Sequence, residues 1–348
     1  MLLSDIPVAP DGVCEQSDGM PIAIEPLVDR YHDEVYEISR SAWNADIPDI
    51  PFSSPAVFAA TLWSSWPATT HERYVAFLDG VAVGFLQLNL PQADNLGNVD
   101  VNLLTAPRSR RCGAGRAMWA HAVERTRALG RKNLIGTTTD HSAAGGAFAV
   151  AVGASPGLHD VRSRLDLPPP QQDRLDALLA DSWRHADGYR LEQWTGVPAD
   201  EFIADVAYLD GRLFLDAPTG DLAIEPQKVD AARVREAEER QFAVGRTTFH
   251  TGVVHVATGR MIAWTMIAGD NDTPAHAWQN ITIVDPDHRG HRLGMIVKLE
   301  NLRYLRAKVP ALAAISTFNA AANRHMLAIN EAMGFRRVDS WIQWQLTL

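Results

Sequence analysis

The chain has 348 residues, a net charge of −10 and 46% hydrophobic residues, a composition typical of a soluble globular protein with room for two domains. The negative charge argues against sequence-independent binding to nucleic acid, which requires a basic face. The two cysteines, Cys14 and Cys112, exclude a disulfide framework and a cysteine-rich metal site.

Residues 1–20 are rich in Pro, Gly, Asp and Ser, so we expect a flexible N-terminus. This stretch has no secretory signal pattern, and the longest apolar run, GGAFAVAVGA, is too short to span a bilayer. We therefore expect a cytoplasmic protein without membrane contact.

The next segment predicts an α/β unit. PIAIEPL predicts a strand and Val28 to Ala42 a helix, followed by two strands, RYVAFLDG and VAVGFLQLNL, that meet at a hairpin turn, Asp79-Gly80. A strand, a Pro-containing loop, a Gly/Arg-rich turn and a long helix follow in NVDVNLLTAPRSRRCGAGRAMWAHAVERTRALG. The strand KNLIGTTT, a helix ending near Gly153 and a last pair of strands complete the unit.

The same order of elements returns in the second half. YRLEQWTG predicts a strand, and a helix follows with Pro198 in its first turn. A hairpin turns at Thr258-Gly259, and WQNITIVDPDHRGHRLGMIVKLENLRYLRAK repeats the strand, loop and long helix. LAAISTFN and a helix ending near Gly334 follow. The halves are therefore diverged copies of one unit, which gives domains at 21–168 and 188–348, joined by a linker helix within 169–187.

The turn RRCGAG, Arg110 to Gly115, predicts an anion site. Its glycines let backbone N–H groups face one concavity, and the following helix adds its positive N-terminal end. No Walker motif is present, and Met118 stands where a dinucleotide fingerprint requires a third glycine. The turn fits the acyl-CoA loop R/Q-x-x-G-x-G/A; a plain helix entry is the alternative.

The second copy of this turn is DHRGHRLGM, Asp287 to Met295. Its Arg292 occupies a glycine position of the first copy, so the backbone there must accept a side chain, while Gly294 is retained. We interpret it as a working loop in which Arg289 and Arg292 take over part of the phosphate binding.

The segments VDPDHRGHRLG and STFNAAANRHMLAINEAMGF resemble the GNAT superfamily of acyl-CoA N-acyltransferases. Because both halves match, the resemblance implies two tandem GNAT domains, each with a mixed, mostly antiparallel α/β sheet flanked by helices and with splayed fourth and fifth strands. It also implies an acyl-CoA co-substrate, normally acetyl-CoA, whose pantetheine arm pairs with the fourth strand. The candidate CoA-binding residues are Ile283, Val284, His288, Arg289, Gly290, His291, Arg292, Leu293, Gly294, Asn319, Asn323, Thr105, Arg110, Arg111, Cys112, Gly113, Ala114, Gly115 and Arg116. Asn319 and Asn323 have a structural alternative, as a strand end and a helix cap.

The catalytic residues depart from the family. Many members have a tyrosine acid four residues before the final Gly-Phe, where this chain has Asn330 and Ala149. Asn330 can hydrogen-bond a thiol or a water but is not an acid. Many members also carry a glutamate on the fourth strand, where Asp100 and Gln279 stand. We name Asn330, Asp100 and Glu225 as candidate catalytic residues.

The resemblance also implies that the acidic loop DAPTGDLAIEP borders the acceptor site. Its carboxylates, among them Asp216 and Asp221, are candidates to hold an ammonium group, and Trp278 is a candidate pocket wall; a solvated loop and core packing are the alternatives.

These features predict a metal-free N-acyltransferase that acts on a small-molecule amine, as a monomer or homodimer, with its chemistry in the C-terminal half. Asp100 and the intact RRCGAG loop favour the opposite half. The alternatives are a mycothiol-synthase-like or antibiotic-modifying acetyltransferase, and a non-catalytic CoA-binding scaffold or sensor.

Overall fold

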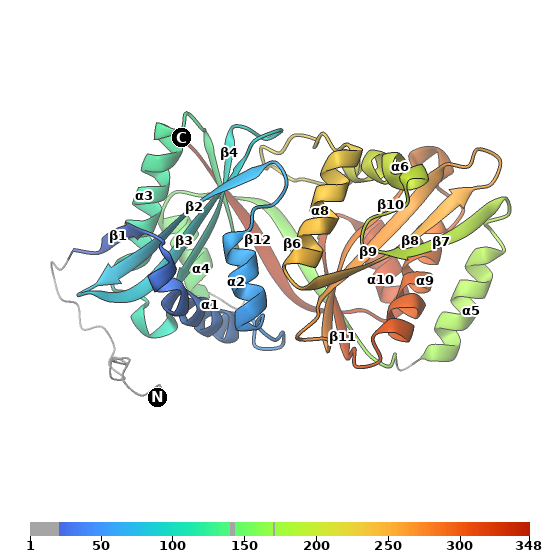
Figure 1. The fold of residues 1–348 in the computed structure, drawn as a ribbon, viewed down its shortest axis with the longest axis horizontal. Helices are drawn as coiled ribbons and strands as arrows, with labels where there is room; N and C mark the ends of the chain where they lie inside the picture. Colours follow the sequence, from blue (N-terminus) through green and yellow to red (C-terminus); the bar gives the residue numbers. More distant parts are fainter. Residues whose placement is uncertain (1–20, 140–142, 170) are drawn as a thin grey trace.

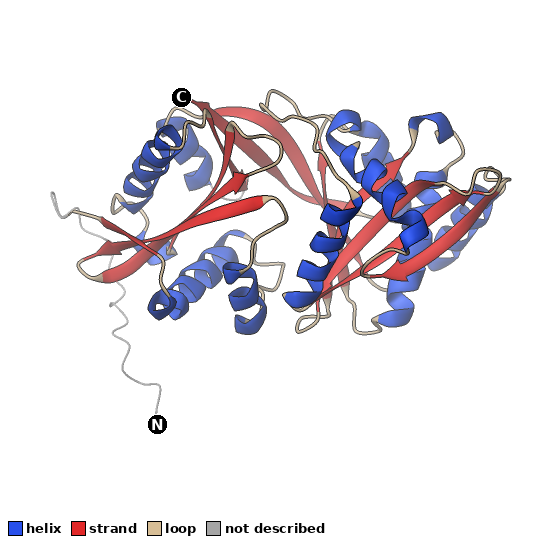
Figure 2. Cartoon of the chain, turned by 45° about the horizontal axis from the view of Figure 1, so that its top comes forward, coloured by secondary structure: helices blue, strands red, loops and turns tan. Residues whose placement is uncertain are grey.

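A computed structural model describes residues 21–139, 143–169 and 171–348. The N-terminal stretch 1–20 therefore lies outside the described residues. Within them, all twelve strands form one sheet, in the order β1-β2-β3-β4-β5-β12-β6-β11-β10-β9-β8-β7. Figure 2 shows this sheet running through the molecule with helices on both of its faces. The strands are β1 (Ala23–Pro26), β2 (Thr69–Leu78), β3 (Val81–Pro91), β4 (Asn98–Thr105), β5 (Asn133–Thr139), β6 (Ser155–Asp166), β7 (Tyr189–Thr195), β8 (Arg246–His255), β9 (Met261–Asp270), β10 (His276–Val284), β11 (Ala314–Ala320) and β12 (Arg336–Thr347).

The helices follow the predicted order in both halves. The first half contains α1 (His32–Asp46), α2 (Pro55–Trp63), α3 (Ala114–Ala128) and α4 (Ala143–Ala151), and α5 (Gln172–Trp183) lies in the predicted linker. The second half contains α6 (Asp200–Gly211), α7 (Leu213–Asp216), α8 (Ala231–Ala243), α9 (Leu293–Lys308) and α10 (Arg324–Met333). Three short 3-10 turns, η1 (Asp29–Tyr31), η2 (Pro107–Ser109) and η3 (Pro286–His288), precede α1, α3 and α9. None of the described helices is long and apolar enough to cross a membrane.

Local sequence accounts for several element ends. Asp79 and Gly80 both have positive φ, as the tight turn between β2 and β3 requires. Ser54 caps α2 by accepting a hydrogen bond from the Val57 N–H, and Pro55 occupies the first turn of the same helix. Pro198 does not begin its helix as expected: α6 starts at Asp200, so the proline lies in the loop before it.

The last strands of the two halves are exchanged. β12, from the end of the chain, pairs with β5 of the first half, whereas β6 of the first half pairs with β11 of the second. The two also pair with each other, and in Figure 1 they cross the middle of the molecule. The expectation of a last strand pair within each half was therefore wrong, because each half supplies one long strand to the other.

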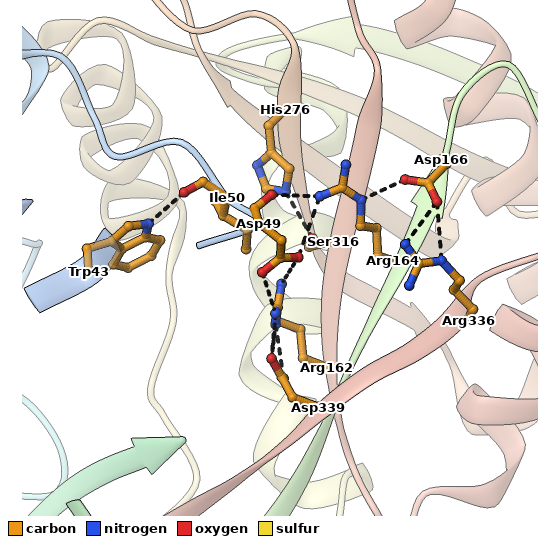
Figure 3. Close-up of polar contacts among 10 residues, drawn as sticks. All are labelled: Trp43, Asp49, Ile50, Arg162, Arg164, Asp166, His276, Ser316, Arg336 and Asp339. Atoms are coloured by element: carbon orange, nitrogen blue, oxygen red, sulfur yellow. Dashed lines mark hydrogen bonds and ion pairs between the residues drawn. The ribbon is translucent and has the colours of Figure 1, made fainter. Parts of the chain in front are cut away.

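A buried arginine joins the halves where these strands meet. The guanidinium of Arg162 on β6 forms ion pairs with Asp339 on β12 and with Asp49 from the segment between α1 and α2. Arg162 and Asp339 have side chains that are only 1% exposed. Figure 3 shows this cluster, with Arg164 also reaching Asp49. The exchange of strands and this cluster make the two halves one packed unit.

Candidate functional site

In each half, two neighbouring parallel strands of the sheet part after a few paired residues. β4 pairs with β5 only from Asn98 to Val101, and β10 pairs with β11 only from His276 to Gln279. The remaining residues of β4 and β10 continue without a partner on that side, which leaves a gap between the strands. The gap is the splay that the sequence predicted.

The strand β10 carries a bulge at this point, and β4 does not. Between Gln279 and Thr282 the register against β9 shifts by one residue, whereas β3 and β4 pair regularly along their whole contact. The side-chain amide of Gln279 is buried in the bulge and donates to the carbonyl oxygens of Met266 and Ile281. Bulges redirect a strand and expose its backbone, and they are common beside active sites.

The loops after the two strands have matching backbones. In the first half Arg111 and Gly113 have φ of 71° and 87°, and in the second half Gly290 and Arg292 have φ of 90° and 57°. Arginine and glycine therefore exchange places at the two left-handed positions. As expected from the sequence, the backbone at Arg292 accepts a side chain, and α9 begins directly after it.

The arginines of the second loop are held by carboxylates. Arg289 lies 3.0 Å from Asp216, which also accepts hydrogen bonds from Arg212, and Arg292 pairs with Asp181. Asp216, predicted at the acceptor site, thus lies at the loop. An anion that binds to the two exposed arginines must compete with these carboxylates.

A cavity of about 1150 Å³ opens from this loop into the gap between β10 and β11. It passes the start of α9 and one side of α10 and reaches the opposite face of the sheet at Phe318. Of the binding residues predicted from the sequence, the following line this cavity: Ile283, Val284, His288, Arg289, Gly290, Arg292, Leu293, Gly294, Asn319, Asn323 and Asp216. His291 is not among the lining residues; its Nδ1 lies 3.1 Å from the carbonyl oxygen of His185.

The first half has a smaller cavity, of about 480 Å³. Phe148 of α4 lies across Gly115, since a Cβ added to this glycine would be 3.4 Å from its ring, and Trp119 packs edge-on against Phe148. Arg110 forms an ion pair with Asp46 on α1 at 2.8 Å. Of the CoA-binding residues predicted in this half, Thr105, Arg110, Arg111, Gly113, Gly115 and Arg116 line the cavity. Cys112 and Ala114 lie between them in the loop.

The exchanged strands complete both cavities. Gln343 and Trp344 are neighbours on β12, and Gln343 lines the cavity of the second half while Trp344 lines that of the first. Asp160, on β6, lines the second cavity and accepts a hydrogen bond from Gln343 Nε2 at 2.6 Å. Asp160 is buried, and this burial raises the pKa of its carboxyl, although Gln343 opposes the shift. Asp160 was not among the predicted site residues, because in sequence it belongs to the half opposite to the cavity.

Three predicted asparagines lie together beside the cavity. Asn330 is buried and donates from Nδ2 to Asn319 Oδ1 at 2.7 Å. Asn323 caps α10 by accepting from the Met326 N–H, as the structural alternative predicted, and it also lines the cavity. Asn330 thus orients Asn319 and does not itself line the cavity.

The remaining candidates lie apart from the two loops. Asp100 on β4 is exposed at its surface, although the protein packed around its carboxyl desolvates it and raises its pKa to about 6. Asp221 and Glu225 are exposed on a loop whose backbone bonds to Gly157 and Asn95 of the first half. Trp278 stacks on Phe318, with ring centroids 5.4 Å apart, and so supports one wall of the second cavity.

A buried lysine, Lys298 of α9, also lines the second cavity. Its nitrogen lies 5.4 Å from the centre of the Phe335 ring. Complete burial lowers the pKa of Lys298 from 10.5 to about 7. Lys298 belongs to no motif recognised in the sequence.

The lowered pKa predicts a pH-dependent stability difference. Between about pH 7 and 10.5 the amine is neutral in the folded chain and protonated in the unfolded chain, so the free energy of unfolding rises with pH in this window. Lys298→Met does not titrate and removes this rise. We expect it to stabilise the protein at pH 7 by a few kcal/mol, with the advantage shrinking toward pH 10. Urea unfolding at pH 7 and 9 measures this; the exposed Lys308→Met is the control, and a pH-independent difference contradicts the prediction.

A repeated α/β unit whose central parallel strands part above a Gly/Arg loop defines an N-acetyltransferase type of fold. The acetyltransferase (GNAT) family matches residues 32–150 of the chain. Among solved structures, a tandem GNAT protein from the clavulanic acid biosynthesis pathway is 29% identical, with a TM-score of 0.75; the match covers 94% of this chain and 98% of that one. Residues 32–150 therefore match the GNAT acetyltransferase family, and the fold of the whole chain is that of a tandem GNAT protein.

A second solved structure has the same fold at lower identity. The GCN5-related N-acetyltransferase from Sphaerobacter thermophilus is 13% identical, with a TM-score of 0.68, and the match covers 94% of this chain and 96% of that one. No curated protein sequence gave a significant match.

Proposed function

We propose that the protein transfers an acyl group, normally acetyl, from acyl-CoA to a primary amine of a small molecule, and that the reaction takes place in the C-terminal half. One observation favours the C-terminal half as the site of the reaction. The bulged strand β10 borders a cavity of about 1150 Å³ that joins the two faces of the sheet. The first half has a regular β4 and a smaller cavity, narrowed by Phe148.

The acyl-CoA is proposed to enter along α9. Its pyrophosphate binds at Arg289 to Gly294, where the helix begins and the arginines exchange their carboxylates for phosphate. Gly294 presents no side chain to the pantetheine arm, at a place bordered by Val284 and Ile329, the side chains that a Cβ there would contact. The arm then runs beside the unpaired end of β10 as an added strand would.

The chemistry follows from the groups around the gap. The amine enters from the face with Phe318 and Asp160, loses its proton to the buried carboxylate of Asp160, and attacks the thioester carbonyl directly. A backbone N–H freed by the bulge in β10 stabilises the negative oxygen of the tetrahedral intermediate. The C–S bond then breaks, and the CoA thiolate leaves as a thiol after taking up a proton.

The acceptor is proposed to be a small molecule. The amine side of the cavity is lined by side chains from both halves, such as Asp160 and Phe318, and so is a pocket rather than an open groove. The related tandem GNAT protein comes from a biosynthetic pathway of a small molecule, which supports the same class of acceptor.

The test is an acceptor screen that measures CoA release from acetyl-CoA. The panel contains amino sugars, amino acids, polyamines, amine precursors of low-molecular-weight thiols and aminoglycoside antibiotics. We expect at least one amine to accelerate release well above the rate of hydrolysis. Binding of acetyl-CoA without any amine-dependent release overturns the proposal in favour of a CoA-binding scaffold.

Asp160→Asn is expected to lower kcat/KM for the acceptor by about 10²–10³-fold, because general-base catalysis contributes on this scale. Acetyl-CoA affinity, measured by calorimetry, is expected to stay unchanged, and the loss should shrink at high pH, where the amine is already neutral. Asp173→Asn, at an exposed position of α5 outside the cavity lining, is the control. Equal losses in both variants contradict the role of Asp160.

A further inference from the structure

Lys298 is a lysine that the fold removes from water. Its side chain is 1% exposed, at a position in α9 one turn after Gly294. The nitrogen lies over the ring of Phe335 and has no hydrogen bond or ion pair with any residue that the structure describes. Buried lysines are rare and normally paired, so this amine requires an explanation other than a structural contact.

Lys298 lines the large cavity. It lies on the same side of α9 as Gly294, where a Cβ would contact Ile329 of α10 and Val284 of β10. Gln279 and Thr317, the last residues that β10 and β11 pair, also line this cavity. The gap between the strands begins here. The corresponding position of the first half holds Trp119, which lines the smaller cavity, so the amine distinguishes the second half from the first.

The charged groups of the cavity do not neutralise this lysine. Desolvation is the cause of its lowered pKa of about 7, with no contribution from a neighbouring charge. An amine with this pKa is about half unprotonated at neutral pH, and the unprotonated form is the nucleophile. The titratable and charged residues that line the cavity are Asp160 on β6, Asp181 on α5, Asp216 at the end of α7, His288, Arg289 and Arg292 before α9, and His325 on α10.

We infer that Lys298 is a self-acylation site, at which Nζ attacks the carbonyl carbon of an acyl-CoA thioester held in the same cavity. The N–C bond forms as the C–S bond breaks, the CoA thiolate takes up the proton that the amine loses, and the products are an N-acyl-lysine and free CoA. The step needs no further reactant. It rests on the proposed binding of acyl-CoA in this half.

Acylation of Lys298 has a consequence for the cavity. The amide is neutral, does not return its acyl group to an amine under mild conditions, and adds volume where β10 and β11 part. The modified protein is therefore expected to bind acyl-CoA less well. Self-acylation would act as a brake when acyl-CoA is present and the acceptor is absent.

The experiment incubates the purified full-length protein with acetyl-CoA at pH 7.5 without an acceptor and follows each lysine by peptide mass spectrometry. Lys308 is the internal control, because it belongs to the same helix and lies over an aromatic ring, Tyr304, but is exposed. We expect Lys298 to gain an acetyl group at least ~100-fold faster than Lys308, because a larger fraction of its amine is neutral and because it lies near the thioester.

Three further arms separate the inference from the proposed function. Gly294→Trp is expected to slow acetylation of Lys298 to the rate of Lys308 and to leave the rate at Lys308 unchanged. Gly294→Ala should keep the faster acetylation of Lys298. Acetyl phosphate, which lacks the CoA moiety, should show no preference for Lys298. If acetyl-CoA binds by calorimetry and Lys298 reacts no faster than Lys308, the inference fails while the proposed function stands. If acetyl-CoA does not bind at all, the proposed function itself fails.

Discussion

Gly294→Trp is expected to abolish amine-dependent CoA release by the protein. A Cβ at this position would lie 3.6 Å from Ile329 and 3.7 Å from Val284, so alanine fits without displacing a neighbour. An indole has to extend into the space between the end of β10 and α10, where the pantetheine arm must pass. We expect kcat/KM to fall at least ~100-fold, which corresponds to a loss of about 2.7 kcal/mol of transition-state stabilisation.

Two variants control this experiment. Gly294→Ala should keep its turnover within a few-fold of the parent protein. Gly115→Trp alters the first half, where a Cβ added to the glycine would already lie 3.4 Å from Phe148, and it should leave turnover in the second half unchanged. Circular dichroism and thermal unfolding confirm that each variant is folded. If Gly294→Trp remains active and Gly115→Trp does not, the chemistry takes place in the N-terminal half.

Arg162→Met is expected to lower the free energy of unfolding by about 3–5 kcal/mol. The substitution leaves the carboxylate of Asp339 buried without its cation, and breaking a buried pair on one side has this order of cost. Urea unfolding at pH 7 measures the change. Because Arg162 joins β6, β12 and the segment before α2, the loss should appear in the single transition of the whole molecule.

The neighbouring arginine on the same face of β6 provides the control. Arg164 is more exposed, and its ion pairs with Asp49 and Asp166 lie near the surface, so Arg164→Met should cost only about 1 kcal/mol. The double variant Arg162→Met/Asp339→Leu should recover most of the lost stability, since it removes the buried charge as well. A single variant as stable as the parent protein contradicts the role assigned to the cluster.

The sequence predicted the repeated unit because local signals recur in both halves. Asp79-Gly80 indicates a hairpin, and RRCGAG and DHRGHRLG mark the same strand-to-helix turn twice. The fold class inferred from these signals is confirmed. The roles of the loop arginines and of the asparagines remain predictions, although Asn319 and Asn323 do line the cavity.

Other features depend on contacts between distant parts of the chain. The alternating pattern of β6 and β12 predicts strands but does not specify which sheet edge each one joins, so neither the exchange nor the position of Asp160 could be derived. Lys298 has the spacing of the buried face of α9, three residues after Met295 and four before Leu302, but a lysine gives no signal of burial, and the packing of α10 and Phe335 covers it. The bulge in β10 likewise has no clear signal in WQNITIV.

The exchange of β6 and β12 also constrains how the protein can be made. The edge of β5 receives its partner only when residues 336–347, about 200 residues further along the chain, have been synthesised. Until then a nascent first half presents an unpaired strand edge, which is prone to pair with other chains. Completion of the N-terminal sheet must therefore wait until the second half has been synthesised, and the two halves cannot be separated by proteolysis or recombination without leaving each with an open sheet.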